Sequence, residues 1–143
     1  MKIEKQPSDK FPAKKKIPHI LLAEDNHEMR TLLSMSLRKN GYEVTEFADG
    51  HHMLDYYFCA DPVQTDAAVD LIISDIRMPF LTGMEILEGL HNSEGFPPII
   101  LITAFGDEET HKQAYMLGAA AVFDKPFDIE ELINKVQTIT PSY

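Results

Sequence analysis

Five polar side chains follow apolar runs of this sequence that favour β-strands. Glu24 and Asp25 come after the first run, Asp75 after the third, Thr103 closes the fourth and Lys125 lies just past the fifth. Singly, an acid in such a place usually caps a helix and a lysine is usually solvated. In a parallel sheet, however, the carboxyl ends of the strands share one edge, so we expect the five side chains to meet there.

Three carboxylates in one crevice repel one another, which destabilises the fold unless a cation neutralises them. With oxygen donors and no cysteine or suitably spaced histidine nearby, the pattern favours Mg²⁺ over zinc or copper. A carboxylate beside Mg²⁺ can attack a phosphoryl group while the metal and a lysine hold the charge of the transferred oxygens. We therefore expect Asp75 to be the nucleophile. Metal ligands are expected from Glu24, Asp25, Asp75 and the backbone carbonyl of Arg77.

Apolar runs alternate with segments of helical period along the chain. The expected strands are residues 20–23, 44–48, 71–74, 99–103 and 121–123. Four runs are almost continuously apolar, which is typical of strands buried on both faces, whereas 44–48 alternates and is expected at an edge. Five alternations of strand and helix predict a doubly wound α/β domain with a parallel sheet.

End signals mark the expected helices. Asn40-Gly41 would stop the first helix, because glycine readily takes the left-handed conformation, and the fourth helix is expected to reach Leu117-Gly118. Capping residues are expected at Thr82 with Glu85, at Asp107, and at Asp128 with Glu131. A weaker helix is predicted from Gly50 to about Tyr57, followed by an extended loop over 59–68.

Length and composition fit one soluble globular domain. The chain has 143 residues, of which 44% are apolar and 25% charged. No apolar run approaches the roughly 18 residues of a membrane-spanning helix. Cys59 is the only cysteine and the N-terminus lacks the apolar core of a signal peptide, so we expect a cytoplasmic protein.

The charge divides into a basic arm and an acidic body. Residues 1–17 carry six lysines and two acids, net +4, whereas residues 18–143 carry seven basic and 21 acidic residues, net −14. We expect 1–17 to be a flexible, solvated arm and 18–140 to be the folded domain. Because the body repels nucleic acid and anionic lipid, we expect neither direct nucleic-acid binding nor a membrane partner.

Over about residues 18–140 the chain resembles the response-regulator receiver domains of bacterial two-component signalling. The resemblance is carried in order by Glu24-Asp25, Asp75-x-x-Met78-Pro79 with Gly83, Thr103-Ala104 and Lys125-Pro126-Phe127. It implies a flavodoxin-like sheet of order 2-1-3-4-5 and an acceptor aspartate at Asp75. The donor would be the phosphohistidine of a sensor histidine kinase or a phosphotransfer protein.

The same resemblance implies roles for the neighbouring residues. Asp25 and Asp75 would ligate Mg²⁺ directly and Glu24 mainly through water. Thr103 and Lys125 would contact the new phosphoryl oxygens, and the bond from Lys125 to Pro126 would be cis. The chain departs from the family at Val122, where a Tyr or Phe switch residue is common. Bulky residues two beyond Asp75 and Thr103, namely Arg77 and Phe105, predict slow self-dephosphorylation.

The favoured function is a phosphorylatable switch that acts on an unidentified output protein or passes the phosphoryl group on. Such a protein is a signalling switch and not an enzyme, since it catalyses only its own phosphorylation and dephosphorylation. Two alternatives stay open: a phosphorylation-independent interaction module, and a receiver fragment of a longer regulator. A phosphohydrolase is disfavoured because it commonly needs a second acid where Arg77 stands. The sequence does not identify the kinase or the signal, and it leaves open whether phosphorylation drives formation of a homodimer.

Overall fold

The computed structural model describes residues 17–59, 68–77, 82–90, 96–104 and 106–142. Outside these ranges lie residues 1–16 of the expected arm, residues 60–67 of the expected loop, and Phe105. Among the described residues, no helix is both long and apolar enough to cross a membrane.

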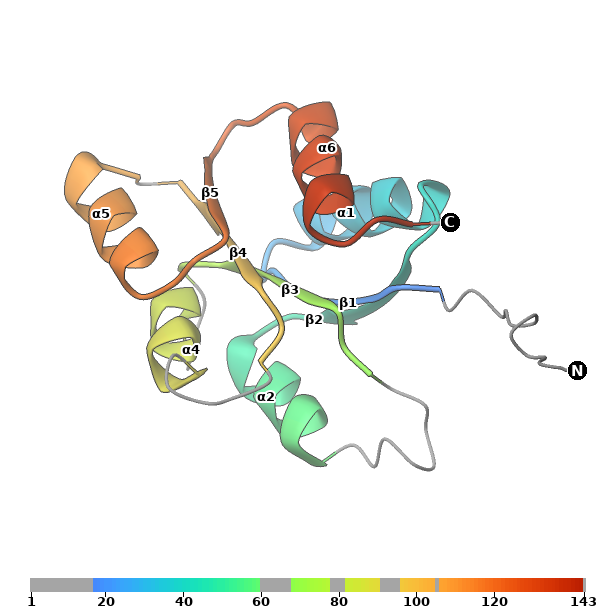
Figure 1. Cartoon of the computed structure of the whole chain (residues 1–143), viewed down its shortest axis with the longest axis horizontal. Coiled ribbons are helices and arrows are strands. Elements are labelled where there is room, and N and C mark those ends of the chain that lie inside the picture. The colour runs from blue at the N-terminus through green and yellow to red at the C-terminus, as the bar shows by residue number, and fades with distance from the viewer. Residues whose placement is uncertain (1–16, 60–67, 78–81, 91–95, 105, 143) are drawn as a thin grey trace, which may run out of the picture.

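A five-stranded parallel sheet forms the centre of the molecule (Figure 1). Its strands are β1 (His19–Ala23), β2 (Glu43–Phe47), β3 (Leu71–Asp75), β4 (Ile99–Thr103) and β5 (Ala121–Asp124). The spatial order β2-β1-β3-β4-β5 confirms the doubly wound receiver topology. Every residue of β1, β3 and β4 is buried, whereas β2 lies at an edge as its alternation predicted.

Helices cover both faces of the sheet (Figure 1). They are α1 (His27–Lys39), α2 (Gly50–Cys59), α4 (Gly83–Leu90), α5 (Glu108–Met116) and α6 (Ile129–Ile139). On one face α1 and α6 pack Leu33, Leu37 and Leu132 against the strands. On the other face α2, α4 and α5 contribute Met53, Ile86 and Ala114 to a second core. The two apolar layers fix the sheet, and so they fix the positions of its strand ends.

Two kinds of helix-end signal are confirmed. At α4, the Thr82 hydroxyl accepts from the Glu85 N–H at 3.1 Å and the Glu85 carboxylate accepts from the Thr82 N–H at 2.9 Å, a reciprocal capping box. Gly41 and Gly118 follow α1 and α5 with φ angles of 94° and 100°. These left-handed residues end the helices where the sequence predicted.

The remaining two caps agree with the sequence in position but not fully in detail. Asp107 caps α5 by accepting from the Thr110 N–H at 2.8 Å. Asp128 caps α6, but it accepts from the N–H of Glu130, one residue earlier than the expected partner Glu131. The cap at Asp128 was therefore predicted correctly, and its capping-box partner was not.

Each edge strand has one backbone group bonded by a side chain of a neighbouring helix. On β2, the carbonyl of Val44 accepts from the Arg38 guanidinium at 2.9 Å. On β5, the N–H of Val122 donates to the Tyr115 hydroxyl at 3.2 Å. These bonds satisfy backbone groups that a sheet edge otherwise leaves to water or to another chain.

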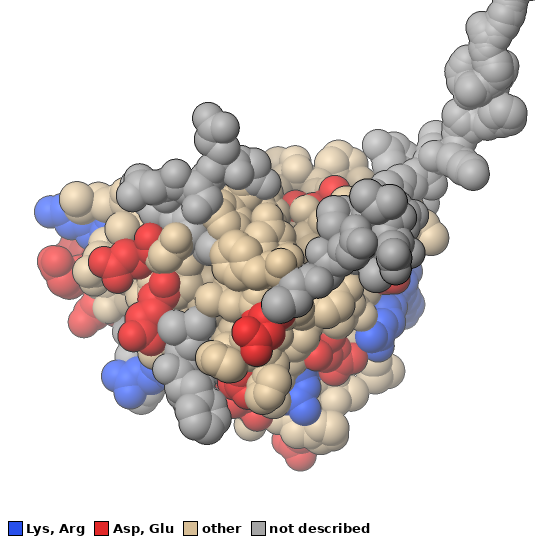
Figure 2. Space-filling view, turned by 90° about the horizontal axis from the view of Figure 1, so that it is seen from below, with Lys and Arg blue, Asp and Glu red and all other residues tan. Residues whose placement is uncertain are grey.

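Acidic side chains are distributed over the surface rather than gathered on one element. On the face seen in Figure 2, described acidic residues are spread among uncharged ones, and the described basic residues lie apart from one another. This agrees with the net charge of −10 for the whole chain.

Candidate functional site

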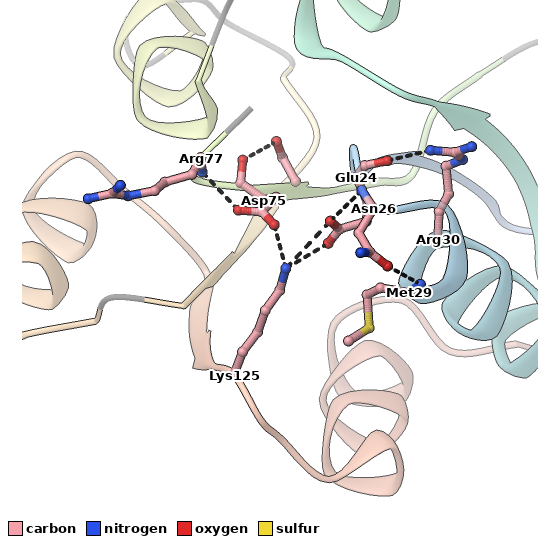
Figure 3. Close-up of polar contacts among 8 residues, drawn as sticks. Glu24, Asn26, Met29, Arg30, Asp75, Arg77 and Lys125 are labelled. Carbon is pink, nitrogen blue, oxygen red and sulfur yellow. Dashed lines mark hydrogen bonds and ion pairs between the residues drawn. The ribbon is translucent and has the colours of Figure 1, made fainter. Parts of the chain in front are cut away.

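Side chains from three strand ends meet at the carboxyl edge of the sheet. The Lys125 ammonium, just after β5, lies 2.6 Å from Asp75 Oδ2 at the end of β3 and 3.2 Å from Glu24 Oε1 after β1 (Figure 3). The peptide bond between Lys125 and Pro126 is cis, as the resemblance implied. One cation is thus placed between two carboxylates that are remote in sequence.

Backbone hydrogen bonds continue the sheet just beyond the strands and hold these residues in place. The Lys125 N–H donates to the carbonyl of Thr103 at 2.7 Å, and the Glu24 N–H donates to the carbonyl of Phe47 at 3.0 Å. Because both bonds extend the ladder between neighbouring strands, the side chains that follow are positioned by the sheet itself.

Three carboxylates form a compact acidic cluster. Glu24, Asp25 and Asp75 each offer one oxygen, and these oxygens all lie within 4.8 Å of one another. Glu24 and Asp75 are buried, whereas Asp25 is exposed. Within the described residues, Glu24 Oε1 is buried and accepts no hydrogen bond, although the Lys125 ammonium is nearby.

These features fit a divalent cation. The donors are hard oxygens, two are withdrawn from water, and one buried carboxylate oxygen retains a free acceptor site. Magnesium prefers such oxygen ligands and typically uses one or two carboxylates together with water and phosphate.

The electrostatics of the cluster also favour a bound cation. The pKa of Glu24 is raised to about 7, chiefly by burial of the carboxylate and to a smaller extent by the charge of Asp75. The N–H of Asn26, which donates to Glu24 Oε2 at 3.1 Å, and the Lys125 ammonium both act in the opposite direction. Near neutral pH the proton on Glu24 is therefore easily displaced by a second positive charge.

Lys125 remains charged in this setting. Burial of the ammonium lowers its pKa, but the hydrogen bond with Asp75 and the charges of Asp75 and Glu24 outweigh burial, so the pKa of Lys125 is raised overall. The site consequently holds a permanent positive charge beside the carboxylate expected to react.

Hydrogen bonds and a close backbone contact fix Asp75. Its Oδ1 accepts from the Arg77 N–H at 2.8 Å while Oδ2 accepts from Lys125. Gly83, the first residue of α4, lies so close to the end of β3 that a Cβ on it would lie 2.6 Å from the Asp75 carbonyl oxygen. Glycine at 83 was recognised in the motif, but the motif did not indicate this contact.

The structure brings together Glu24, Asp25, Asp75 and Lys125 as the sequence predicted. Thr103 ends β4 and is buried at the same edge. Arg77 reaches Asp75 through its N–H, whereas the expected role of its carbonyl as a metal ligand stays a prediction.

Sequence reasoning missed one neighbour of the site. The Arg30 guanidinium on α1 donates to the carbonyl of Glu24 at 2.8 Å (Figure 3). No motif or spacing pointed to this residue. The only signal was an arginine in the first turn of a helix that follows two acids.

Comparison with known proteins gives a consistent result. A family model described as the response regulator receiver domain matches residues 20–137. The chain is 31% identical over 122 residues to sporulation initiation phosphotransferase F of Bacillus subtilis, covering 85% of this chain and 93% of that protein. It is 30% identical to the DNA-binding transcriptional regulator NtrC of Klebsiella pneumoniae over 85% of this chain, but spans only 24% of NtrC.

Solved structures agree with these relatives. Chemotaxis protein CheY4 of Vibrio cholerae superimposes with a TM-score of 0.74 at 29% identity, over 87% of this chain and 99% of that one. The receiver domain of the Francisella response regulator 1452 gives a TM-score of 0.76 at 26% identity, over 85% and 95% of the two chains.

Proposed function

This chain belongs to the response-regulator receiver family, and on that premise we propose that it is a phosphoacceptor switch. Asp75 takes a phosphoryl group from the phosphohistidine of a sensor histidine kinase or phosphotransfer protein, in a reaction that depends on Mg²⁺. The family's role in signalling is common to its members, whereas the acceptor, the metal and the partners are our proposal for this chain.

The observation that carries the proposal is the environment of Asp75. A buried carboxylate lies within 2.6 Å of an ammonium group and within 4.8 Å of two further carboxylates. A purely structural ion pair needs one acid for one lysine, whereas three acids around one lysine leave excess negative charge. A site for a metal ion and a phosphoryl group accounts for that excess.

Residues of the cluster divide the chemistry between them. Glu24, Asp25 and Asp75 would hold Mg²⁺, which when bound neutralises the charge that develops on the phosphoryl oxygens. One Asp75 carboxylate oxygen forms a bond to phosphorus while the bond from phosphorus to the donor nitrogen breaks, and that nitrogen keeps the electron pair. The Arg77 N–H holds Oδ1 and so orients the carboxylate for this attack.

Lys125 and Thr103 would then respond to the new charge. The ammonium that contacts Asp75 is close enough to pair with a phosphoryl oxygen, and Thr103 lies at the end of the adjacent strand. A phosphoryl group adds up to about two negative charges. Their attraction for these two groups would bias the positions of β4, β5 and α5, and through them binding to an output protein or to a second copy.

A mass measurement tests the proposal. Acetyl phosphate is incubated with the wild-type protein, with Asp75→Asn and with Asp55→Asn, a control at an exposed aspartate on α2, each with and without Mg²⁺. We expect one phosphoryl adduct that requires both Mg²⁺ and Asp75 and is unchanged in the control. A folded wild-type protein that binds Mg²⁺ but gains no adduct would instead support the phosphorylation-independent interaction module.

A further inference from the structure

The side chain of Arg30 joins three segments beside the acidic cluster. Its Nη1 donates to the carbonyl of Glu24 at 2.8 Å, its Nη2 lies 3.2 Å from His27 Nδ1, and its Nε lies 3.7 Å from Glu46 Oε1 on β2. The Arg30 side chain is only 17% exposed. All three parts of the guanidinium are therefore engaged.

The carbonyl that Arg30 holds belongs to the peptide group between the two neighbouring acids of the cluster. The N–H of Glu24, in the preceding peptide group, donates to the carbonyl of Phe47 at the end of β2. In the described parts of the chain, no hydrogen bond or ion pair involves the Asp25 carboxylate. The direction of the Asp25 side chain thus depends on its backbone, and the Arg30 bond restrains that backbone.

Glu46 in turn restrains Arg30. Its Oε2 accepts from the buried hydroxyl of Ser34 at 2.8 Å and lies 3.2 Å from the Arg38 guanidinium. Its Oε1 is the atom that faces Arg30. Residues that orient metal ligands in this way commonly change metal affinity about 10- to 100-fold when replaced.

We propose that Arg30 is a positioning residue for the metal site: it fixes the peptide between Glu24 and Asp25 so that both carboxylates face Asp75. The inference rests on the proposed function, in which this cluster binds Mg²⁺. Arg30 itself does not touch the metal or the phosphoryl group.

The charge of Arg30 and its positioning role predict opposite effects of its removal on cation binding, which makes the inference testable. Arg30 is a cation close to an acidic cluster, so its removal would strengthen cation binding if Coulomb repulsion alone mattered. If Arg30 acts by holding the peptide, its removal must weaken cation binding instead.

The experiment measures Mg²⁺ affinity by isothermal titration calorimetry for the wild type, Arg30→Met and Arg38→Met. Arg38 is a matched control because it pairs with the same Glu46 and carries the same charge but makes its backbone contact at Val44. We expect Arg30→Met to raise the dissociation constant about 10-fold. For Arg38→Met we expect a constant equal to that of the wild type or slightly lower.

A second readout follows the peptide directly. Amide NMR without metal should show a shifted Asp25 N–H resonance in Arg30→Met, because the Arg30 bond is made by the same peptide group, and an unshifted resonance in Arg38→Met. If Arg30→Met fails to fold, Arg30→Lys replaces it, with a smaller change in the same direction. Affinity and an Asp25 resonance like those of the wild type would overturn the inference. Absence of Mg²⁺ binding to the wild type would instead contradict the proposed function, and the Asp25 resonance would still test the positioning role.

Discussion

Replacing Glu24 by glutamine should stabilise the metal-free protein at alkaline pH. The substitution keeps the shape of the side chain and removes a carboxylate that is fully buried and whose Oε1 accepts no hydrogen bond from the described residues. Chiefly because of burial, the pKa of Glu24 is raised from 4.5 to about 7 in the folded protein. The unfolded chain has the ordinary value, so the two states bind protons differently between these limits.

The sign of the pH effect follows from proton binding. Between pH 4.5 and about 7 the folded protein holds a proton on Glu24 that the unfolded chain has released. The free energy of unfolding therefore falls as pH rises through this interval, and the loss is complete above pH 7. One pKa unit corresponds to about 1.4 kcal/mol, so the rise from 4.5 to about 7 gives an upper bound of about 3.5 kcal/mol. Local relaxation lowers the cost of a buried charge, so we expect roughly 1–3 kcal/mol.

The assay is urea unfolding followed by circular dichroism at pH 5 and pH 8, with metal removed. Glu24→Gln and the wild type should have similar stability at pH 5, and the variant should be more stable by roughly 1–3 kcal/mol at pH 8. Adding Mg²⁺ at pH 8 should recover the stability of the wild type more than that of the variant. Glu43→Gln, at an exposed position on β2, serves as the control.

Two results would refute this reasoning. A difference between Glu24→Gln and the wild type that is the same at pH 5 and pH 8 would mean that the carboxylate charge is not the cause. A variant less stable than the wild type at pH 8 would mean that Lys125 more than compensates for burial of the carboxylate.

Two further substitutions test the packing and the charge of the site. Gly83→Ala places a Cβ 2.6 Å from the Asp75 carbonyl oxygen and should destabilise the protein by about 1–3 kcal/mol and slow its phosphorylation. Gly89→Ala in α4 is the control, because its Cβ would meet no atom within 4 Å, and it should leave the stability unchanged or raise it by up to about 1 kcal/mol. Equal effects of the two substitutions on stability would contradict the contact between Gly83 and Asp75. Lys125→Met removes the cation that lowers the pKa of Glu24, so that pKa should rise further and the metal-free protein should lose about 1–3 kcal/mol at pH 8 in urea unfolding. Adding Mg²⁺ should restore most of the lost stability. Lys135→Met, at an exposed position on α6, serves as the control and should leave the stability unchanged. A Lys125→Met protein as stable as the wild type would argue against the ion pair.

The fold was predictable because its signals are local. Continuous apolar runs identified the buried strands, and the alternating pattern around Val44 identified an edge strand. Thr82 with Glu85 marked a helix start within four residues of sequence. The partner of Asp128 was predicted wrongly because an N-cap side chain can accept from the N–H of either the second or the third helical residue. Here Asp128 accepts from Glu130, the second residue of α6.

The site was predictable only as far as topology determines it. Asp75 and Lys125 were expected to meet because both follow parallel strands, and they do meet. The contact between Arg30 and Glu24 could not be foreseen, since it depends on how α1 lies over β2, where Glu46 holds the guanidinium. The close approach of Gly83 to the backbone of Asp75 depends in the same way on how the start of α4 lies against the end of β3.

The side-chain bonds at the two sheet edges limit how copies of this protein can associate. An uncovered edge can recruit a strand from another molecule and begin a continuous intermolecular sheet. Here Arg38 occupies a carbonyl on β2, and Tyr115 occupies an N–H on β5. The second bond depends on the place of α5: if this helix moved away, the Tyr115 hydroxyl would leave with it and the N–H of Val122 would become available to another strand. Access of another strand to this part of the edge is therefore linked to the position of a single helix.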